Sequence, residues 1–420
     1  MFGPDYASRH GLFFTVNSCT VEYDIGRQAM VMDLEQRSRA GNSIIGAFVA
    51  DAATMGLHWV YSQRRIVELA PESPEFRQPD EADYEGGVGY FAHAAKKVGD
   101  LSQYGEQMLV MLRSLAETDG VFNRAHYTEQ FRRHFGYGGE FVGYIDRPTR
   151  QTLDRIYHDE NEAIERVNAI PYAGNERDQG SMLTKVLAAV KQYEGQGLRD
   201  RVEWYANEMP EPALSRAYGL QLVDALAATE DFPGAVDEQL PAISKLPPLV
   251  ACHFDDEELS SVCDSAIRVT NNAPRALDYG RVCMAVLRSS IAGKPVTSSL
   301  HSAVESGSST TQEVLNSALA SDLPVRKLSK EVGLHCDLGA GVPSVFHNLK
   351  TTSSYIDAIR SNIYAGGDNC GRAIVLGAVC GASFGLDGDH GIPGAWLNRV
   401  NRVDEIQSLV GRLFGLPGLT

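Results

Sequence analysis

The stretch that decides the fold runs from Tyr364 to Trp396 and reads YAGGDNCGRAIVLGAVCGASFGLDGDHGIPGAW. A glycine pair, Gly366 and Gly367, precedes Asp368, and a run of small and apolar residues follows. Glycine and alanine recur at helical spacing in this run, so one face of the predicted helix can approach a neighbour closely. Free backbone N–H groups and the positive end of the helix dipole lie at the start of such a helix. The stretch therefore predicts a buried helix with an active-site acid, Asp368, at its N-terminus.

A second helix rich in small residues is predicted from Arg37 onward. Ile44, Phe48 and Ala52 recur at helical spacing, and glycine and alanine fill many of the positions between them. Such a pattern is typical of a central helix that its neighbours surround tightly. The segment runs into the sequence GLHW at positions 56–59, whose histidine and tryptophan can face a cleft.

Helical patterns dominate the rest of the chain, so we expect an all-α fold in which many helices form a single compact bundle. Residues 1–37 lack helical periodicity and are expected to form a partly disordered N-terminal extension, which leaves 38–420 as the helical domain. Loops are expected at 71–100 and 336–343, which are rich in proline and glycine. Further helices are expected at 101–116, 183–193, 199–207, 213–228, 235–244, 255–269, 276–292, 297–305, 310–321, 323–333, 342–349 and 353–364.

The composition is that of ordinary globular protein. Hydrophobic residues make up 43% of the 420 residues, which is ample for a core. A formal net charge of −16 argues against nucleic acid or an anionic membrane as a partner. No apolar run approaches the roughly 20 residues needed to span a bilayer. The seven cysteines are scattered and form no CxxC motif, so we expect free thiols and a cytoplasmic location.

Polar side chains at three predicted helix ends can meet in one pocket of an all-α fold. Asp51 and His58 lie near the end of the small-residue helix that is predicted from Arg37 onward. Ser102 is the expected N-cap of the helix that opens with Gln103-Tyr104-Gly105-Glu106. Gly367-Asp368-Asn369 stands at the start of the small-residue helix that is predicted within the stretch from Tyr364 to Trp396. Carboxylates in such a pocket suit a divalent cation, general-base chemistry or the recognition of ribose hydroxyls.

Each of these side chains also has a purely structural interpretation. Asp51 can bind a neighbouring helix end, His58 can be a core histidine, and Glu106 in a first helical turn favours the dipole without any catalysis. Cys370 is more often a small buried hydrophobe than a ligand. The glycine-rich loop that includes residues 339–343 offers backbone N–H groups to a phosphate if it precedes a helix.

Three blocks of the sequence form a recognisable set: GAFVADA at 46–52, Gln107-Met108, and Gly366-Gly367-Asp368 with Ile392-Pro393 and Trp396. Over about residues 39–400, the chain resembles the ADP-ribosylglycohydrolase superfamily, whose corresponding patterns are G-x-x-x-G-D-A, T-D-D-T-Q-M, and G-G-D-x-D-T followed by I-P-x-x-W. The order and spacing of the blocks are more specific than any one block. The resemblance implies an orthogonal helical bundle with a cleft. In that cleft two divalent cations bind, and water attacks a ribosyl carbon to break an N- or O-glycosidic bond.

Several positions depart from the family pattern. Gln103-Tyr104-Gly105-Glu106 stands where the family has T-D-D-T, and Cys370 and Gly371 replace the second aspartate and the threonine of the last block. Mg²⁺ is implied by the resemblance, but Asp368 is its one matched ligand, so the full two-metal site is not supported. The replaced positions stay polar or aromatic, which favours a remodelled cleft over one that became core.

We expect a hydrolase-like protein that acts on an ADP-ribosyl or related small ribosyl substrate. The candidate catalytic residues are Asp368, Glu106 and Asp51. The candidate substrate-binding residues are His58, Trp59, Tyr104, Asn369 and Gly367. Two alternatives stay open. One is a catalytically inactive binding or structural protein, since some cnidarian lens crystallins resemble the same superfamily. The other is metal-independent chemistry in which Tyr104, His58 and Glu106 form the acid–base set.

Overall fold

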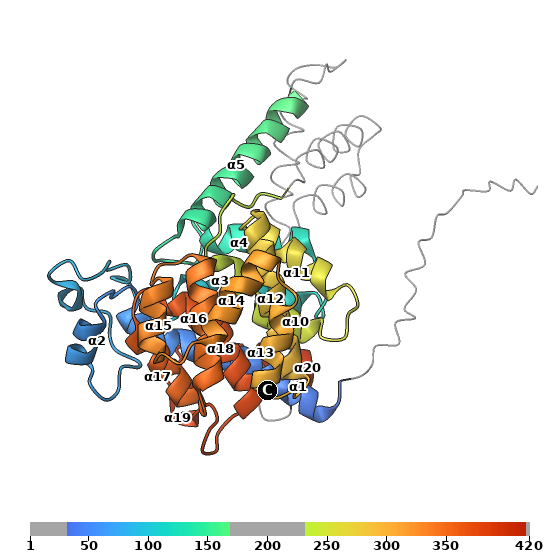
Figure 1. The fold of residues 1–420 in the computed structure, drawn as a ribbon. Helices are drawn as coiled ribbons and strands as arrows, with labels where there is room; N and C mark the ends of the chain where they lie inside the picture. Colours follow the sequence, from blue (N-terminus) through green and yellow to red (C-terminus); the bar gives the residue numbers. More distant parts are fainter. Residues whose placement is uncertain (1–31, 169–231, 417–420) are drawn as a thin grey trace, which may run out of the picture. The chain divides into compact units, whose positions relative to one another are not determined.

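The computed structural model describes residues 32–168 and 232–416 (Figure 1). Within these ranges the protein is all-α, as predicted, with isolated β-bridges but no β-strand. Most of the predicted N-terminal extension, and the predicted helices at 183–193, 199–207 and 213–228, lie outside the described residues. A search of the described helices finds none that is long and apolar enough to cross a membrane.

The described helices fall into two runs along the chain. The first contains α1 (Leu34–Thr54), the 3₁₀ helix η1 (Met55–Leu57), α2 (Gln63–Leu69), the 3₁₀ helix η2 (Glu81–Tyr84), α3 (Gln103–Glu117), α4 (Arg124–Phe135) and α5 (Arg147–Asn168). The second contains α9 (Pro241–Ser244), α10 (Leu246–Cys252), α11 (Leu259–Arg268), α12 (Pro274–Ile291), α13 (Val296–Val304), α14 (Ser309–Ala320), α15 (Val325–Val332), α16 (Leu338–Thr351), α17 (Tyr355–Ala365), α18 (Asn369–Phe384), α19 (Gly394–Leu397) and α20 (Val403–Phe414).

Two local predictions are wrong. Residues 235–240 are not helical, since α9 begins only at Pro241 and Ala235 instead forms a bridge with Asn271. The predicted loop at 336–343 is mostly helix, because α16 begins at Leu338. Asp337 caps this helix by accepting a hydrogen bond from the Gly339 backbone N–H at 2.7 Å, and that cap outweighs the turn signal of the glycines.

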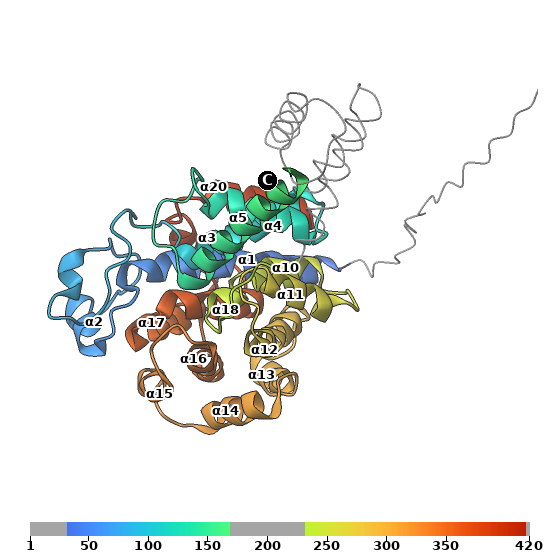
Figure 2. The ribbon, with the colours of Figure 1, turned by 90° about the horizontal axis from the view of Figure 1, so that it is seen from above.

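Helices α1 and α18 pack against each other backbone to backbone, and Figure 2 shows them side by side at the centre of the surrounding helices. A Cβ atom at Gly46 would lie 2.4 Å from the Gly377 carbonyl oxygen, and one at Gly381 would lie 2.2 Å from that of Asn42. Glycine is therefore required for this approach. The order of these contacts makes the two helices antiparallel, so the C-terminal end of α1 lies beside the N-terminal end of α18.

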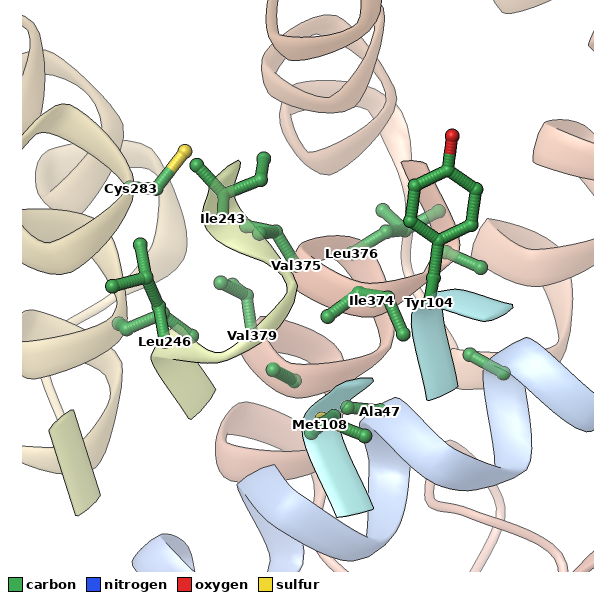
Figure 3. Close-up of a cluster of buried hydrophobic side chains, with 14 of the residues drawn as sticks. Ala47, Tyr104, Met108, Ile243, Leu246, Cys283, Ile374, Val375, Leu376 and Val379 are labelled. Carbon is green, nitrogen blue, oxygen red and sulfur yellow. The ribbon is translucent and has the colours of Figure 1, made fainter. Parts of the chain in front are cut away.

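Side chains from α1, α3, α9, α10, α12 and α18 gather around this helix pair (Figure 3). Val379 of α18, Met108 of α3 and Ile243 of α9 belong to this apolar cluster and are almost fully buried. Close-packed apolar burial of this kind is the main favourable contribution to folding. The core thus holds the ends of α1, α3 and α18 in fixed positions.

Asp51 joins α1 to the start of α3. Its carboxylate accepts hydrogen bonds from the Ser102 backbone N–H at 2.8 Å and the Ser102 hydroxyl at 2.5 Å. Ser102 is the N-cap of α3, as predicted. A Cβ atom at Gly105 would lie 2.2 Å from an Asp51 carboxylate oxygen, so the two helices meet with little space between them. Burial raises the pKa of Asp51 to about 7, against the opposing effect of the bonds from Ser102.

Replacing Gly377 by alanine should destabilise the fold. The new methyl group would lie 2.4 Å from the Ala50 Cβ and 2.5 Å from the Gly46 carbonyl, so two helix backbones must separate. We expect a loss of roughly 1–3 kcal/mol in the free energy of unfolding, measured by urea denaturation. Gly280→Ala is the matched control, because its methyl group meets only the flexible end of Ile267. Equal stability of the two variants would contradict the close backbone contact.

Asp51 should make stability depend on pH. Its folded-state pKa of about 7 lies above its ordinary value of 3.8, so between these values the folded protein binds more protons than the unfolded chain. Stability should therefore fall as pH rises from 4 to 7, by at most on the order of 4 kcal/mol from this group. Unfolding of Asp51→Asn, measured across this range, should lack that component. Asn at the fully exposed Asp322 should leave the pH dependence as in the wild type.

Candidate functional site

Two glycines place Asp368 at the start of α18. Gly366 and Gly367 adopt φ values of 76° and 66°, in the left-handed region that favours glycine. A Cβ atom at Gly367 would lie 2.1 Å from the Leu334 carbonyl oxygen. The Gly367 N–H donates to the Val60 carbonyl at 2.8 Å, which ties this turn to the segment that follows α1. The turn is therefore rigid, and Asp368 emerges from it as the N-cap of α18.

Three donors of the protein satisfy the Asp368 carboxylate. Oδ1 accepts from His58 Nε2 at 2.9 Å and from the Gly371 backbone N–H at 3.1 Å, and Oδ2 accepts from the Tyr104 hydroxyl at 2.5 Å. His58, Tyr104 and Asp368 are all essentially inaccessible to solvent. Burial acts to raise the pKa of Asp368, but the bonds from His58 and Tyr104 and the charge of Arg372 hold it below its usual value. Asp368 is therefore an ionised, buried carboxylate.

His58 also contacts a second histidine, His93. Its Nδ1 lies 2.7 Å from His93 Nε2, and the two rings stack with centroids 5.0 Å apart. Burial and the neighbouring His58 and Lys96 lower the pKa of His93 well below its usual value. His93 is therefore neutral at physiological pH. Its other ring nitrogen, Nδ1, is buried and has no hydrogen-bond partner among the described residues.

Aromatic rings lead from these histidines to the surface. The Trp59 ring lies 4.2 Å from His58, 4.9 Å from Tyr144 and 5.7 Å from Tyr90, measured between centroids. Trp59 is buried, whereas Tyr90 is 56% exposed and Tyr144 is half-buried. Burial and the charge of Asp146 raise the pKa of Tyr144. These rings form an aromatic cluster beside the histidine pair, with Tyr90 and Tyr144 in contact with solvent.

Glu106 lies in a separate cluster. Lys96 Nζ donates to one of its oxygens at 3.1 Å, and His134 Nε2 lies 3.0 Å from the other. Lys96 also lies over the Phe141 ring, 4.6 Å from its centroid. Burial opposes ionisation, but His134 and Lys96 lower the pKa of Glu106. Glu106 is thus an ionised member of a buried charge cluster.

Several buried polar atoms near the helix starts have no hydrogen-bond partner in the described structure. Besides His93 Nδ1, they include both side-chain polar atoms of Gln103, Oδ1 of Asn369 and one terminal nitrogen of Arg372. Arg372 otherwise bonds Asn362 and the Gly366 carbonyl, and burial lowers its pKa to about 10. An unpaired buried polar atom costs on the order of 1–3 kcal/mol, so these atoms are ones that a polar ligand or water would satisfy.

The donor set does not fit the metal site that the family resemblance implies. Both Asp368 oxygens already accept from the chain, and Tyr104 donates directly to a carboxylate that would otherwise face a cation. Cys370 is buried, and burial raises its thiol pKa well above the usual value, so it supplies no thiolate. Among the described residues, no group of three His, Cys, Asp or Glu side chains could hold an ion.

The predicted site residues separate into three groups. Asp368, His58 and Tyr104 form one hydrogen-bonded cluster. The predicted residues Gly367 and Trp59 flank this cluster. Asn369 directly follows Asp368, and its Nδ2 donates to the Leu57 carbonyl at 3.3 Å. Asp51 is bound at the α1–α3 junction and Glu106 in its own charge cluster. Sequence reasoning missed His93, because it lies in a long loop without periodicity and meets His58 from 35 residues away.

Comparisons with known proteins agree with this architecture. The model of the ADP-ribosylglycohydrolase family matches residues 32–419. Crystallin J1A of Tripedalia cystophora is 25% identical over 376 residues, which cover 89% of this chain and 95% of the crystallin. Crystallin J1B of the same organism is 24% identical, with 89% and 96% covered.

A solved structure shares the fold. It is titled an ADP-ribosylglycohydrolase-related protein complex, has a TM-score of 0.52 and 16% sequence identity, and the match covers 91% of this chain and 98% of that one. At this identity the likeness concerns the fold alone. The family match extends over all of the described residues and includes both glycine-rich helices and the Asp368 turn. This chain belongs to the ADP-ribosylglycohydrolase family.

Proposed function

We propose that the protein hydrolyses an N- or O-glycosidic bond of an ADP-ribosyl or related ribosyl substrate without a divalent cation. The observation that carries the proposal is the buried chain Asp368–His58–His93, which ends in an unpartnered ring nitrogen. Family membership supports the substrate class. We further propose a cytoplasmic location, which the free thiols of the described cysteines support.

We propose one tautomer for each histidine, consistent with the hydrogen bonds. An ionised carboxylate can only accept hydrogen bonds. His58 Nε2 must therefore carry a proton and donate it in the hydrogen bond to Asp368. In the proposed arrangement, His58 Nδ1 accepts from His93 Nε2–H. In this tautomer His93 Nδ1 keeps its lone pair, as a general base requires, and among the described residues it has no partner. The same logic of a carboxylate that orients a histidine operates in hydrolytic triads.

In the proposed step, His93 Nδ1 removes a proton from water as the water oxygen attacks the ribosyl carbon. The bond from that carbon to the leaving nitrogen or oxygen breaks, and the leaving atom keeps the electron pair and takes up a proton from solvent. Protonated His93 then releases its proton to solvent, which restores the base. The charge that develops on His93 is stabilised through His58 by Asp368. Asp51 and Glu106 take part in the proposal as groups that hold α3, and with it Tyr104, in position.

The aromatic cluster supports a nucleoside-like substrate. The rings of Trp59, Tyr90 and Tyr144 lie within 6.0 Å of one another, measured between centroids, and two of them reach solvent. Aromatic side chains stack on nucleobases with useful affinity, on the order of 1–3 kcal/mol per base. Gly367, Asn369 and Trp59 are proposed to contact the ribose or base.

A catalytically inactive protein is the second candidate. It is favoured by the saturation of the Asp368 carboxylate with donors from the chain itself, because a group bound in this way stabilises the fold without a substrate. The similarity to Crystallin J1A supports the same candidate.

Turnover of ADP-ribosyl-arginine by the purified chain should persist in excess EDTA. Asp368→Asn and His93→Gln should each reduce kcat by about 100-fold or more, because proton transfer by a positioned base contributes 10²–10⁴-fold. His301→Gln, at an exposed histidine on α13, is the control and should retain full activity. Loss of turnover in EDTA with recovery in Mg²⁺ would refute the metal-independent mechanism. An absence of both hydrolysis and binding would favour the inactive protein.

The pH profile should identify the base. The pKa of His93 lies well below 6.5, so the neutral base persists into mildly acidic solution. We expect kcat/KM to stay constant from pH 8 to pH 6 and to fall only under more acidic conditions. Steady-state kinetics over this range test the expectation. A fall centred near the ordinary histidine value would assign the base to a different, more exposed group.

A further inference from the structure

A groove between α2 and α15 lies outside the cluster just described. It encloses about 480 Å³ and is open to solvent. Arg64 of α2 and Arg326 and Lys330 of α15 line it, and Glu68 is the acid among the lining residues. Three cations against one acid make the groove locally positive, in a chain whose formal net charge is −16.

Arg326 and Lys330 of α15 have no acidic partner among the described residues. Arg64 and Glu68 satisfy each other, since Nε of Arg64 lies 2.7 Å from a Glu68 oxygen. Arg326 and Lys330 lie one helical turn apart, so their side chains project from the same face of α15. Within the described part of the chain, neither of them forms an ion pair. A dianion in the groove would satisfy both.

Two hydroxyl groups of the groove, those of Ser62 and Tyr61, can donate to an anion. The Ser62 oxygen accepts from the Arg65 N–H at 3.2 Å as the N-cap of α2, which leaves its own O–H available to donate. Tyr61 is 39% exposed, and burial and the charge of Asp368 raise the pKa of its phenol to about 12, so it stays protonated. Val67 and the Tyr61 ring supply apolar surface. This combination suits an anionic group attached to an organic body.

Hydrogen bonds of the Gln63 side chain hold the backbone on both sides of the groove in place before any ligand binds. The Gln63 side-chain amide donates to the Arg326 carbonyl at 2.7 Å and to the Ala365 carbonyl at 2.8 Å. Gln63 thus ties the two walls to the end of α17, just before the turn that places Asp368. The backbones on both sides of the groove are therefore held in place, and the ordering cost of binding falls on the exposed side chains of Arg326 and Lys330.

We propose that this groove binds a phosphate monoester of a small organic molecule, with Arg326 and Lys330 as its main ligands. Two cations match the charge of a dianionic phosphate, and charge-assisted hydrogen bonds of this kind are the strongest that a solvent-open site offers. The binding site stands independently of hydrolysis, because its residues are distinct from the Asp368 cluster.

Isothermal titration of the full chain with phenyl phosphate, phenol and inorganic phosphate tests the proposal. Phenyl phosphate should bind, and phenol should bind at least tenfold more weakly. Arg326→Gln and Lys330→Gln should each weaken phenyl phosphate binding by about tenfold. Both side chains are exposed, and the Arg326 carbonyl that Gln63 uses is kept, so the fold should persist; thermal unfolding checks this.

Lys327→Gln is the matched control, since this exposed lysine lies on the same helix but does not line the groove. It should bind phenyl phosphate as the wild type does. An equal loss in Lys327→Gln would show non-specific attraction and overturn the proposal, as would equal binding of phenol. Tighter binding of an acidic peptide than of phenyl phosphate would reassign the groove to a protein partner. Asp368→Asn should keep phenyl phosphate affinity, which separates this site from the hydrolytic one.

Discussion

The structure depends on the backbone contact between α1 and α18. Gly46, Gly377 and Gly381 allow two helices to touch through their main chains, and any side chain at these positions would collide with a carbonyl or a methyl group. Because the helices are antiparallel, this contact brings the C-terminal end of one beside the N-terminal end of the other. The opposed partial charges of these ends favour the arrangement. His58 and Asp368 follow and precede these ends, so their hydrogen bond is a direct result of helix packing.

In this site, hydrogen-bond donors of the protein contact Asp368 where the family resemblance implies metal ions. The family resemblance implies carboxylates that face cations across the cleft, whereas here a phenol and an imidazole donate directly to Asp368. Such donors balance the buried negative charge without an ion. They also leave the carboxylate with little acceptor capacity, so its chemical influence must pass through His58. In this way a position that the family uses for metal binding becomes the anchor of a hydrogen-bonded chain.

Much of this arrangement could be predicted from sequence, because the signals are local. The small-residue spacing of α18, the Ser102 cap and the glycine pair before Asp368 are all readable within a few residues. His93 could not be found in this way, since only the folded loop brings it to His58. The loop predicted at 336–343 failed for the opposite reason. Its glycines signal a turn, but the cap at Asp337 and the buried neighbours of α16 decide the local structure.

The sequence separation of the central contacts has a consequence for how the chain is made. His58 and Asp368 are 310 residues apart, and α1 finds its glycine-lined partner only when α18 exists. During synthesis, the apolar face of α1 therefore leaves the ribosome long before the helix that covers it. An uncovered helix of this kind is a target for chaperones and for aggregation. The close contact between α1 and α18 that stabilises the folded protein therefore leaves the apolar face of α1 in need of protection from aggregation during synthesis.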